Sequence, residues 1–296
     1  MPLFGGIDIG ASTAKLVVID EQRRIVGRAM RRSGVDYAQT AQRALDEALA
    51  SGHLEGKTVD RFFSTGYGRD NVPFAHDRRT EIACHGKAAF HAFPQAITVL
   101  DIGAQDCKVI HLDAAGRRTG FKMNRKCAAG TGAFLEEIAY RLDLSPAELN
   151  GLAERSTREA PLGSFCTVFA ATEILEKIRA GVKVEDIIKG AFRSVVKRLV
   201  EMDTISGALV LTGGVVAHNP LLVRLIEETF NRPALVPPLP QFCGAFGAAL
   251  FAAESFEQSN QPSAERTSPS PRRPWIGRSG PSDQQETNRD RQQPAR

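Results

Sequence analysis

Two stretches of the chain repeat one another. Residues Ile7 to Asp20, IDIGASTAKLVVID, align without a gap with Leu100 to Asp113, LDIGAQDCKVIHLD. In each stretch an apolar run reaches an aspartate, a glycine-bearing turn follows, and a second β-branched run returns, which predicts a β-hairpin. A single DxG sequence is a common strand end, but a duplicated one indicates a repeated architecture. The chain is therefore expected to contain two related lobes.

The two predicted turns carry residues suited to phosphate and magnesium. If the turns face each other, Asp8, Asp101 and several backbone N–H groups surround one cleft. The candidate ATP-binding residues of the two turns are Gly10, Ala11, Ser12, Thr13, Lys15, Gly103, Gln105 and Asp106. The candidate catalytic residues are Asp8 and Asp101, which would hold Mg²⁺, and Gln105, which would orient a water.

Later glycine-containing segments extend this predicted nucleotide site. Thr131 and Gly132, at an expected helix start, would add phosphate donors aided by the helix dipole. The further candidate ATP-binding residues are Gly130, Gly213, Gly214, Asn219 and Gln241. A GxxxxGK[ST] sequence is absent, and the GTG after Cys127 lacks the wider dinucleotide-binding pattern, so neither a P-loop nor a dinucleotide site is expected.

Length and composition predict how the chain divides. With 296 residues, 42% of them hydrophobic, it can bury two cores. We expect a first ATPase lobe at 1–95, a second lobe at 96–254 and a disordered polar tail at 255–296. The final helix is predicted at Gly244 to Ala253 and is a candidate to pack back on the first lobe. In the helix after Thr167, the residues expected on the apolar side are Phe169, Ile174, Leu175 and Ile178.

Charge and hydropathy indicate which classes of partner and which cellular location to expect. The net charge of +4 is small and the basic residues are scattered, so nucleic acid is not an expected partner. The sequence has neither a signal peptide pattern nor a run of about 18 apolar residues. We therefore expect a cytoplasmic protein that does not enter a membrane.

The five cysteines show no disulfide pattern, because they are odd in number and widely spaced. Cys127 and Cys166 differ from Cys84, Cys107 and Cys243 because each precedes an expected helix, where the helix dipole stabilises a thiolate. Two thiolates per chain cannot complete a four-cysteine iron–sulfur site, but a symmetric dimer can. Spacing alone leaves both this site and two buried thiols open.

Six motifs together resemble the activator ATPases of 2-hydroxyacyl-CoA dehydratases, which are related to the ATP-binding subunits of benzoyl-CoA reductases. The resemblance spans roughly residues 3 to 254, and its cysteine-containing motif is highly specific. The motifs are Ile7 to Gly10, Thr65 to Arg69, Asp101 to Asp106, Lys126 to Gly132, Cys166 to Phe169 and Leu211 to Gly214.

The resemblance implies a duplicated, two-lobed α/β ATPase fold like that of actin, Hsp70 and sugar kinases. It implies a homodimer with one [4Fe-4S] cluster bridged by Cys127 and Cys166 of both subunits, and ATP and Mg²⁺ as further cofactors. The implied activity is ATP-driven delivery of single electrons, at low potential, to an acyl-CoA dehydratase or reductase. Reduced ferredoxin or flavodoxin is the expected electron source.

The sequence departs from the family at two places. Ala104 stands where the family usually has a second glycine, which adds a methyl group beside the phosphates, and the long tail lies outside the family pattern. The alternatives are the ATP-binding subunit of a multi-subunit benzoyl-CoA reductase, a small-molecule kinase of the same fold, and a nucleotide-switched structural protein like actin. The sequence alone does not decide between the first of these and a homodimeric activator.

Overall fold

Both repeated stretches fold as antiparallel hairpins with the same register. Strand β1 (Phe4–Ile9) pairs with β2 (Thr13–Ile19) so that Asp8 lies opposite Lys15. Strand β6 (Ile97–Ile102) pairs with β7 (Cys107–Leu112) so that Asp101 lies opposite Lys108. The predicted duplication of a hairpin is therefore confirmed at the level of individual residue pairs.

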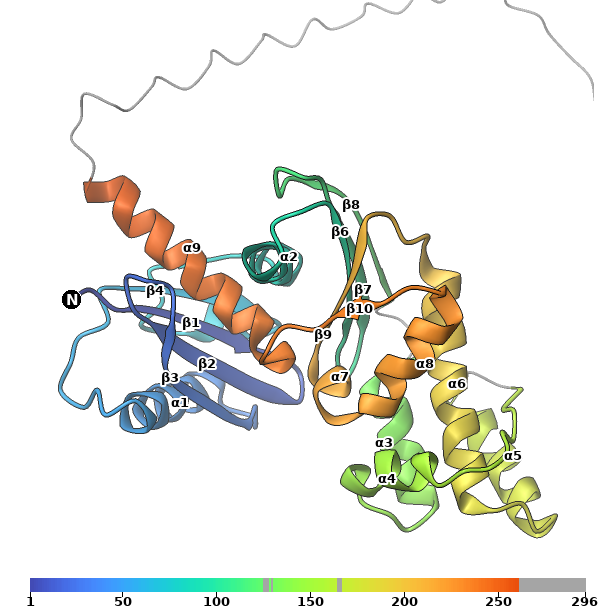
Figure 1. Ribbon diagram of the computed structural model, residues 1–296. Helices are drawn as coiled ribbons and strands as arrows, with labels where there is room; N and C mark the ends of the chain where they lie inside the picture. Colours follow the sequence, from blue (N-terminus) through green and yellow to red (C-terminus); the bar gives the residue numbers. More distant parts are fainter. Residues whose placement is uncertain (125–127, 129, 164–166, 261–296) are drawn as a thin grey trace, which may run out of the picture. The chain divides into compact units, whose positions relative to one another are not determined.

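A computed structural model gives the fold shown in Figure 1 and describes residues 1–124, 128, 130–163 and 167–260. Each hairpin is the centre of one five-stranded sheet. The first sheet has the order β3-β2-β1-β4-β5, and its remaining strands are β3 (Ile25–Arg32), β4 (Arg61–Gly66) and β5 (Asp77–Arg78). The second has the order β10-β9-β6-β7-β8, with β8 (Arg118–Asn124), β9 (Ala208–Thr212) and β10 (Ala234–Leu235).

The described residues include the helices that were expected to begin near Thr131, after Thr167 and near Gly244. The α-helices are α1 (Tyr37–Ser51), α2 (Glu81–Ala92), α3 (Gly132–Arg141), α4 (Leu149–Glu154), α5 (Thr167–Arg179), α6 (Val184–Met202), α7 (Gly214–His218), α8 (Pro220–Phe230) and α9 (Cys243–Asn260). The short 3₁₀ helices are η1 (Arg69–Asn71), η2 (Pro146–Glu148) and η3 (Pro240–Phe242). None of these helices has an apolar stretch long enough to cross a bilayer.

Both faces of the first sheet are covered by apolar packing. Ile7, Ile9 and Leu16 form a core with alanines of α1, whereas Phe4 and Val17 pack on the other face with α9. The second sheet packs its largest core against α3, α4, α6 and α8, and a smaller one against α2. In α5, only Ile174 of the four residues expected on the apolar side is buried.

Helix α9 returns to the first sheet and is longer than predicted. It contacts β1, β4 and α2, beside which it lies in Figure 1. It continues to Asn260, so the prediction that disorder begins at residue 255 was wrong for its last turns. The Phe256 ring packs on Phe4 with centroids 5.4 Å apart, and Glu257 forms a 2.7 Å ion pair with Arg23. These contacts explain why the helix persists into a polar sequence.

Candidate active site

The first hairpin turn offers accessible polar groups. The Gly10 N–H donates to the carbonyl of Thr13 at 3.1 Å, and the Ser33 hydroxyl donates to the Gly10 carbonyl at 2.6 Å. These two hydrogen bonds fix the backbone of the turn. Ala11 is exposed, and the side chains of the other predicted ligands, Ser12, Thr13 and Lys15, are half-buried. The turn can therefore present donors to a phosphate group.

Asp8 lies at the base of this turn and is only 8% exposed. Burial raises the pKa of its carboxyl above the ordinary value of 3.8, and the nearby charge of Lys15 offsets this only in part. A divalent cation would favour the ionised form. Since Mg²⁺ is commonly held by one or two carboxylates together with substrate phosphates, Asp8 fits the role of its protein ligand.

Asp101, the equivalent residue of the second hairpin, has protein partners on both oxygens. Its Oδ1 accepts from the Thr212 hydroxyl at 3.1 Å, and its Oδ2 accepts from Lys108 Nζ at the same distance. Burial alone would raise the pKa of Asp101, but the neighbouring His85 and Lys108 lower it to about 2. This carboxylate is therefore ionised and already neutralised by the protein, which fits a metal ligand less well than Asp8 does.

Lys108 lies inside a cage of three carboxylates. Its Nζ is 3.1 Å from Asp101, 2.6 Å from Asp106 and 2.9 Å from Glu81, and the residue is only 3% exposed. Burial on its own would lower the pKa of Lys108, yet Asp101, Glu81 and Asp106 hold it well above the ordinary 10.5. Glu81 begins α2, so this cage joins that helix to the second hairpin.

The second turn is bonded to the start of α3. The N–H groups of Gly132 and Ala133 donate to the carbonyls of Gly103 and Ala104 at 2.9 and 2.8 Å. Cys107 Sγ also donates to the Gly130 carbonyl at 3.0 Å. The predicted phosphate donors at this helix start are thus partly engaged by the turn itself.

Two other predicted residues near the second turn differ in whether their side chains are available to bind a ligand or water. Gln105 is exposed at the turn. Thr131 is buried, and its hydroxyl donates to the Ala128 carbonyl at 2.6 Å. Gln105 therefore remains available to orient a water, whereas the Thr131 hydroxyl has a partner within its own loop.

A third turn lies directly beside the second hairpin. β9 pairs in parallel with β6 so that Thr212 is opposite Asp101. Gly213 then adopts a φ of +102°, and a methyl group there would collide with the Ile102 carbonyl and lie 2.9 Å from Asp101 Oδ1. Only glycine allows this close approach.

The remaining predicted ATP ligands follow this turn. Gly214 begins α7, and the Asn219 amide donates to the Val215 carbonyl at 2.8 Å. Gln241 is half-buried in η3, whose Pro240 carbonyl accepts from the Gly213 N–H at 3.0 Å. The structure therefore brings Gln241 close to the third turn but uses the Asn219 amide within the protein.

The two predicted cluster ligands, Cys127 and Cys166, lie outside the described residues. The other three cysteines are buried free thiols. Burial raises the pKa of Cys84 to about 12, and it also raises the pKa of Cys107 and of Cys243. Residues 1–124, 128, 130–163 and 167–260 contain no group of three or more His, Cys, Asp or Glu side chains that is arranged to hold a metal ion.

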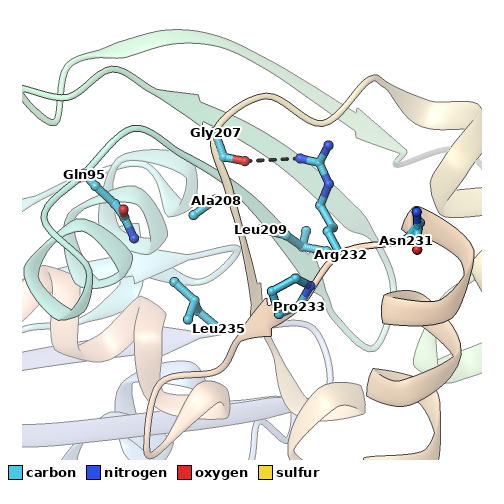
Figure 2. Close-up of a pocket in the computed structure, with 8 residues that line it drawn as sticks. All are labelled: Gln95, Gly207, Ala208, Leu209, Asn231, Arg232, Pro233 and Leu235. Carbon is cyan, nitrogen blue, oxygen red and sulfur yellow. Dashed lines mark hydrogen bonds between the residues drawn. The ribbon is translucent and has the colours of Figure 1, made fainter.

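A separate open hollow of about 410 Å³ lies at the β10 edge of the second sheet (Figure 2). Arg232 crosses it and donates to the Gly207 carbonyl at 3.2 Å, beside Leu209 and Pro233. None of the predicted site residues lines it.

Comparison with known proteins then decides the family. Residues 6–252 match the BadF/BadG/BcrA/BcrD ATPase family. The chain belongs to this ATPase family. The activator of lactoyl-CoA dehydratase from Anaerotignum propionicum is 39% identical over 256 residues, which cover 86% of this chain and 98% of that protein.

Solved structures support the membership of this chain in the BadF/BadG/BcrA/BcrD ATPase family. The component A of (R)-2-hydroxyglutaryl-CoA dehydratase from Acidaminococcus fermentans has a TM-score of 0.81 at 35% identity, covering 86% of this chain and 99% of that one. The ADPNP-bound activator of 2-hydroxyisocaproyl-CoA dehydratase from Clostridium difficile has the same score and identity, covering 87% and 96%.

A sugar kinase shares the fold of this BadF/BadG/BcrA/BcrD ATPase at greater distance. A glucokinase of the ROK family from Streptomyces griseus has a TM-score of 0.53 at 16% identity, covering 85% of this chain and 99% of that one. The predicted two-lobed fold of the actin, Hsp70 and sugar-kinase type is thus confirmed, while the likeness to this kinase shows the fold alone.

Neither Lys108 nor Thr212 was predicted from the sequence as a residue of the candidate site, and three residues that reach this site from helices α2 and α9 were also missed. Glu81 and His85 reach the second hairpin from α2, and Gly244 of α9 lies against Asp8. A signal for Glu81 and His85 was available, because residues four apart in the sequence share a face wherever the segment is helical. Nothing in the sequence indicated that this face meets the hairpin.

Proposed function

We propose that this protein is an ATP-driven activator that delivers single electrons to an acyl-CoA dehydratase or reductase. The observation that carries the proposal is the accessible first hairpin turn with Asp8 at its base, in a chain that matches dehydratase activators over nearly their whole length. The 16% identity with the glucokinase gives a sugar-phosphorylating activity no support beyond the shared fold.

Within this proposal each predicted residue has a distinct role. Asp8 holds Mg²⁺ when the nucleotide is bound, and the ion supplies charge neutralisation of the phosphates. Ser12, Thr13 and Lys15 bind phosphate oxygens, and Gln105 orients the attacking water. Asp101 acts as a positioning residue, because Lys108 and Thr212 already occupy its oxygens. The remaining nucleotide ligands are Gly10, Ala11, Gly103, Asp106, Gly130, Thr131, Gly132, Gly213, Gly214, Asn219 and Gln241.

The proposed electron carrier is one [4Fe-4S] cluster held by Cys127 and Cys166 of two identical subunits. The three described cysteines do not fit as ligands, because their thiols are buried and burial favours the protonated form. Within a two-subunit assembly the remaining two cysteines supply the four thiolates that such a cluster needs. Reduced ferredoxin or flavodoxin in the cytoplasm is the proposed electron source.

Exposed apolar side chains on two contacting helices are the observation in support of the homodimer. Helix α5 carries Phe169, Leu175 and Ile178 with exposed fractions of 68, 51 and 41%, and Tyr140 of the contacting helix α3 is 75% exposed. Large exposed apolar groups on neighbouring helices are typical of protein interfaces. The proposal therefore places the subunit contact on the helices that follow the two cysteine-containing segments.

The test is anaerobic purification of the wild type, Cys127→Ser and Cys166→Ser, with iron content, colour and subunit mass measured together. The wild type should be brown and dimeric, and either serine variant should lose iron yet still bind ATP. Cys243→Ala is the matched control and should keep its iron, because this thiol is buried within the fold. A serine variant with a full cluster would refute the ligand assignment, and a colourless wild type would refute the electron-transfer function.

A further inference from the structure

Helix α2 directs one face toward the carboxylates of both hairpins. Glu81 pairs with Lys108, and one turn later His85 Nδ1 lies 3.3 Å from Asp101 Oδ1 and 3.3 Å from the Thr212 hydroxyl. His85 is only 5% exposed. Its Nδ1 is therefore held by Asp101 and Thr212, which belong to the neighbouring strands β6 and β9.

The second ring nitrogen of His85 faces the first hairpin. A methyl group on Gly244 would lie 3.0 Å from His85 Nε2 and would collide with Asp8 Oδ2. Both polar atoms thus border the same small space, which the absent side chain of Gly244 leaves open. One turn further along α9, a methyl group on Gly247 would collide with the Cys84 carbonyl, so α2 and α9 pack closely at this point.

We propose that His85 is a positioning residue for ATP hydrolysis, one that aligns the Asp8 carboxylate with Asp101 and Thr212. The inference rests on the proposed function of Asp8 as the magnesium ligand. An imidazole suits the position because its two nitrogens lie on opposite edges of a rigid ring, so that a bond at one edge orients the other.

The charges around His85 explain why such a residue is needed. Asp8, Asp101 and Glu81 bring three carboxylates to this region. Lys108 pairs directly with Glu81 and Asp101. The nearby charges of Lys15 and Lys108, by contrast, offset the burial of Asp8 only in part. The ring presents Nδ1 to Asp101, and its Nε2 borders the space at Gly244 that Asp8 Oδ2 also borders, so His85 would limit the orientations that Asp8 can adopt. A loosely held Asp8 would bind ATP but place the metal poorly, and misplacement of reacting groups lowers kcat.

The experiment compares His85→Ala and His85→Gln with a matched control, His91→Ala, on the same helix. His91 is exposed and packs edge-to-face against Phe246, with ring centroids 5.5 Å apart, and within the described part of the chain it forms no hydrogen bond or ion pair with Asp8, Asp101 or Glu81. Steady-state kcat and KM for Mg·ATP should show an approximately tenfold or greater loss of kcat in His85→Ala with little change in KM. Partial recovery is expected in His85→Gln or on addition of free imidazole, and His91→Ala should match the wild type.

Two further variants separate the possible failures. Gly244→Ala keeps His85 but fills the space that it shares with Asp8, so its kcat should also fall. If Asp8→Asn is inactive while His85→Ala and Gly244→Ala both turn over normally, the positioning role is wrong and the proposed site stands. If Asp8→Asn itself hydrolyses ATP normally, the proposed site is wrong. Circular dichroism and ATP binding confirm that each variant is folded. If His85→Ala does not fold, the kcat of His85→Gln is the test of the positioning role.

Discussion

Asp8 and Asp101 occupy equivalent positions in the two hairpins, yet their surroundings give them opposite properties. Burial raises the pKa of Asp8, whereas His85 and Lys108 outweigh burial at Asp101 and lower its pKa to about 2. A raised carboxyl pKa means that the ionised group destabilises the folded protein, and a lowered one means that it stabilises it. Of the two, the ionised carboxylate that the fold compensates less is therefore that of Asp8, the residue proposed to bind the metal.

This difference predicts opposite stability changes for two otherwise identical substitutions. Without nucleotide, Asp8→Asn should raise the urea midpoint of unfolding at neutral pH, because a poorly compensated buried charge is removed. Asp101→Asn should lower the free energy of unfolding by about 3 kcal/mol, because Lys108 loses one of its buried partners. Equal effects of the two substitutions would contradict the electrostatic assignment.

The pH dependence of the same two variants provides the control. Below pH 3.8, Asp8 is protonated in both the folded and unfolded states, so the wild type and Asp8→Asn should differ little. As the pH rises toward the raised pKa of Asp8, the unfolded state ionises first and the wild type loses stability relative to the variant. For Asp101 the sign is reversed: its contribution is complete above pH 3.8 and is lost as the pH falls toward about 2.

The sequence identified residues of this site that lie within one hairpin but missed those that reach it from elsewhere. Asp8, Asp101 and Lys15 belong to a repeated pattern that is visible in the sequence, although Lys108, which stands opposite Asp101 in the same pattern, was not predicted as a site residue. Glu81 and His85 enter the site only because α2 packs on the second sheet, a contact between distant segments. The expectation that Asp101 holds Mg²⁺ treated the two hairpins as equal, although Thr212 and Glu81 make their surroundings different.

At the scale of single elements, the end of helix α9 was predicted wrongly from amino-acid composition. The prediction of disorder from residue 255 followed from the polar sequence, yet Phe256 and Glu257 pack against Phe4 and Arg23. The extended part of the helix thus has two side chains with partners in or next to the first sheet. The hairpins, by contrast, were predictable because their pattern is local.

Two truncations should therefore differ in stability. Removal of residues after Asn260 should leave the melting temperature and ATPase activity near the wild-type values. Removal of residues after Glu254 deletes Phe256 and Glu257 and should destabilise the protein by about 1–3 kcal/mol, mostly through lost aromatic packing. Differential scanning calorimetry of the two truncated proteins measures this directly, and identical melting temperatures would show that these contacts contribute nothing.

For the whole molecule, the hydrogen bonds from the second hairpin turn to α3 connect the candidate nucleotide site to the helix that follows the proposed cluster ligand Cys127. The carbonyls of Gly103 and Ala104 accept from the first N–H groups of α3, so a displacement of the turn by phosphate must displace that helix. Cys127 is only three residues before Gly130 in the sequence. Nucleotide state and the proposed cluster are therefore expected to be coupled, and such coupling is reciprocal.

The coupling predicts that the reduction potential and EPR signal of the cluster change between the ADP-bound and ATP-analogue-bound protein. AMP is the control, since without β- and γ-phosphates it should leave both close to those of the nucleotide-free state. The measurement is anaerobic redox titration of the purified dimer in each state. The same potential and signal in all states would mean that hydrolysis and electron transfer are independent in this protein.

The shared register of the two hairpins places an aspartate opposite a lysine in each. Lys15 is half-exposed beside an open turn, whereas Lys108 is enclosed by three carboxylates. The same pair of residues therefore leaves room for a ligand in the first hairpin and forms an internal ion pair in the second. In the proposed site, the two halves of the repeat are thus chemically unequal, and only the first offers its lysine to a nucleotide.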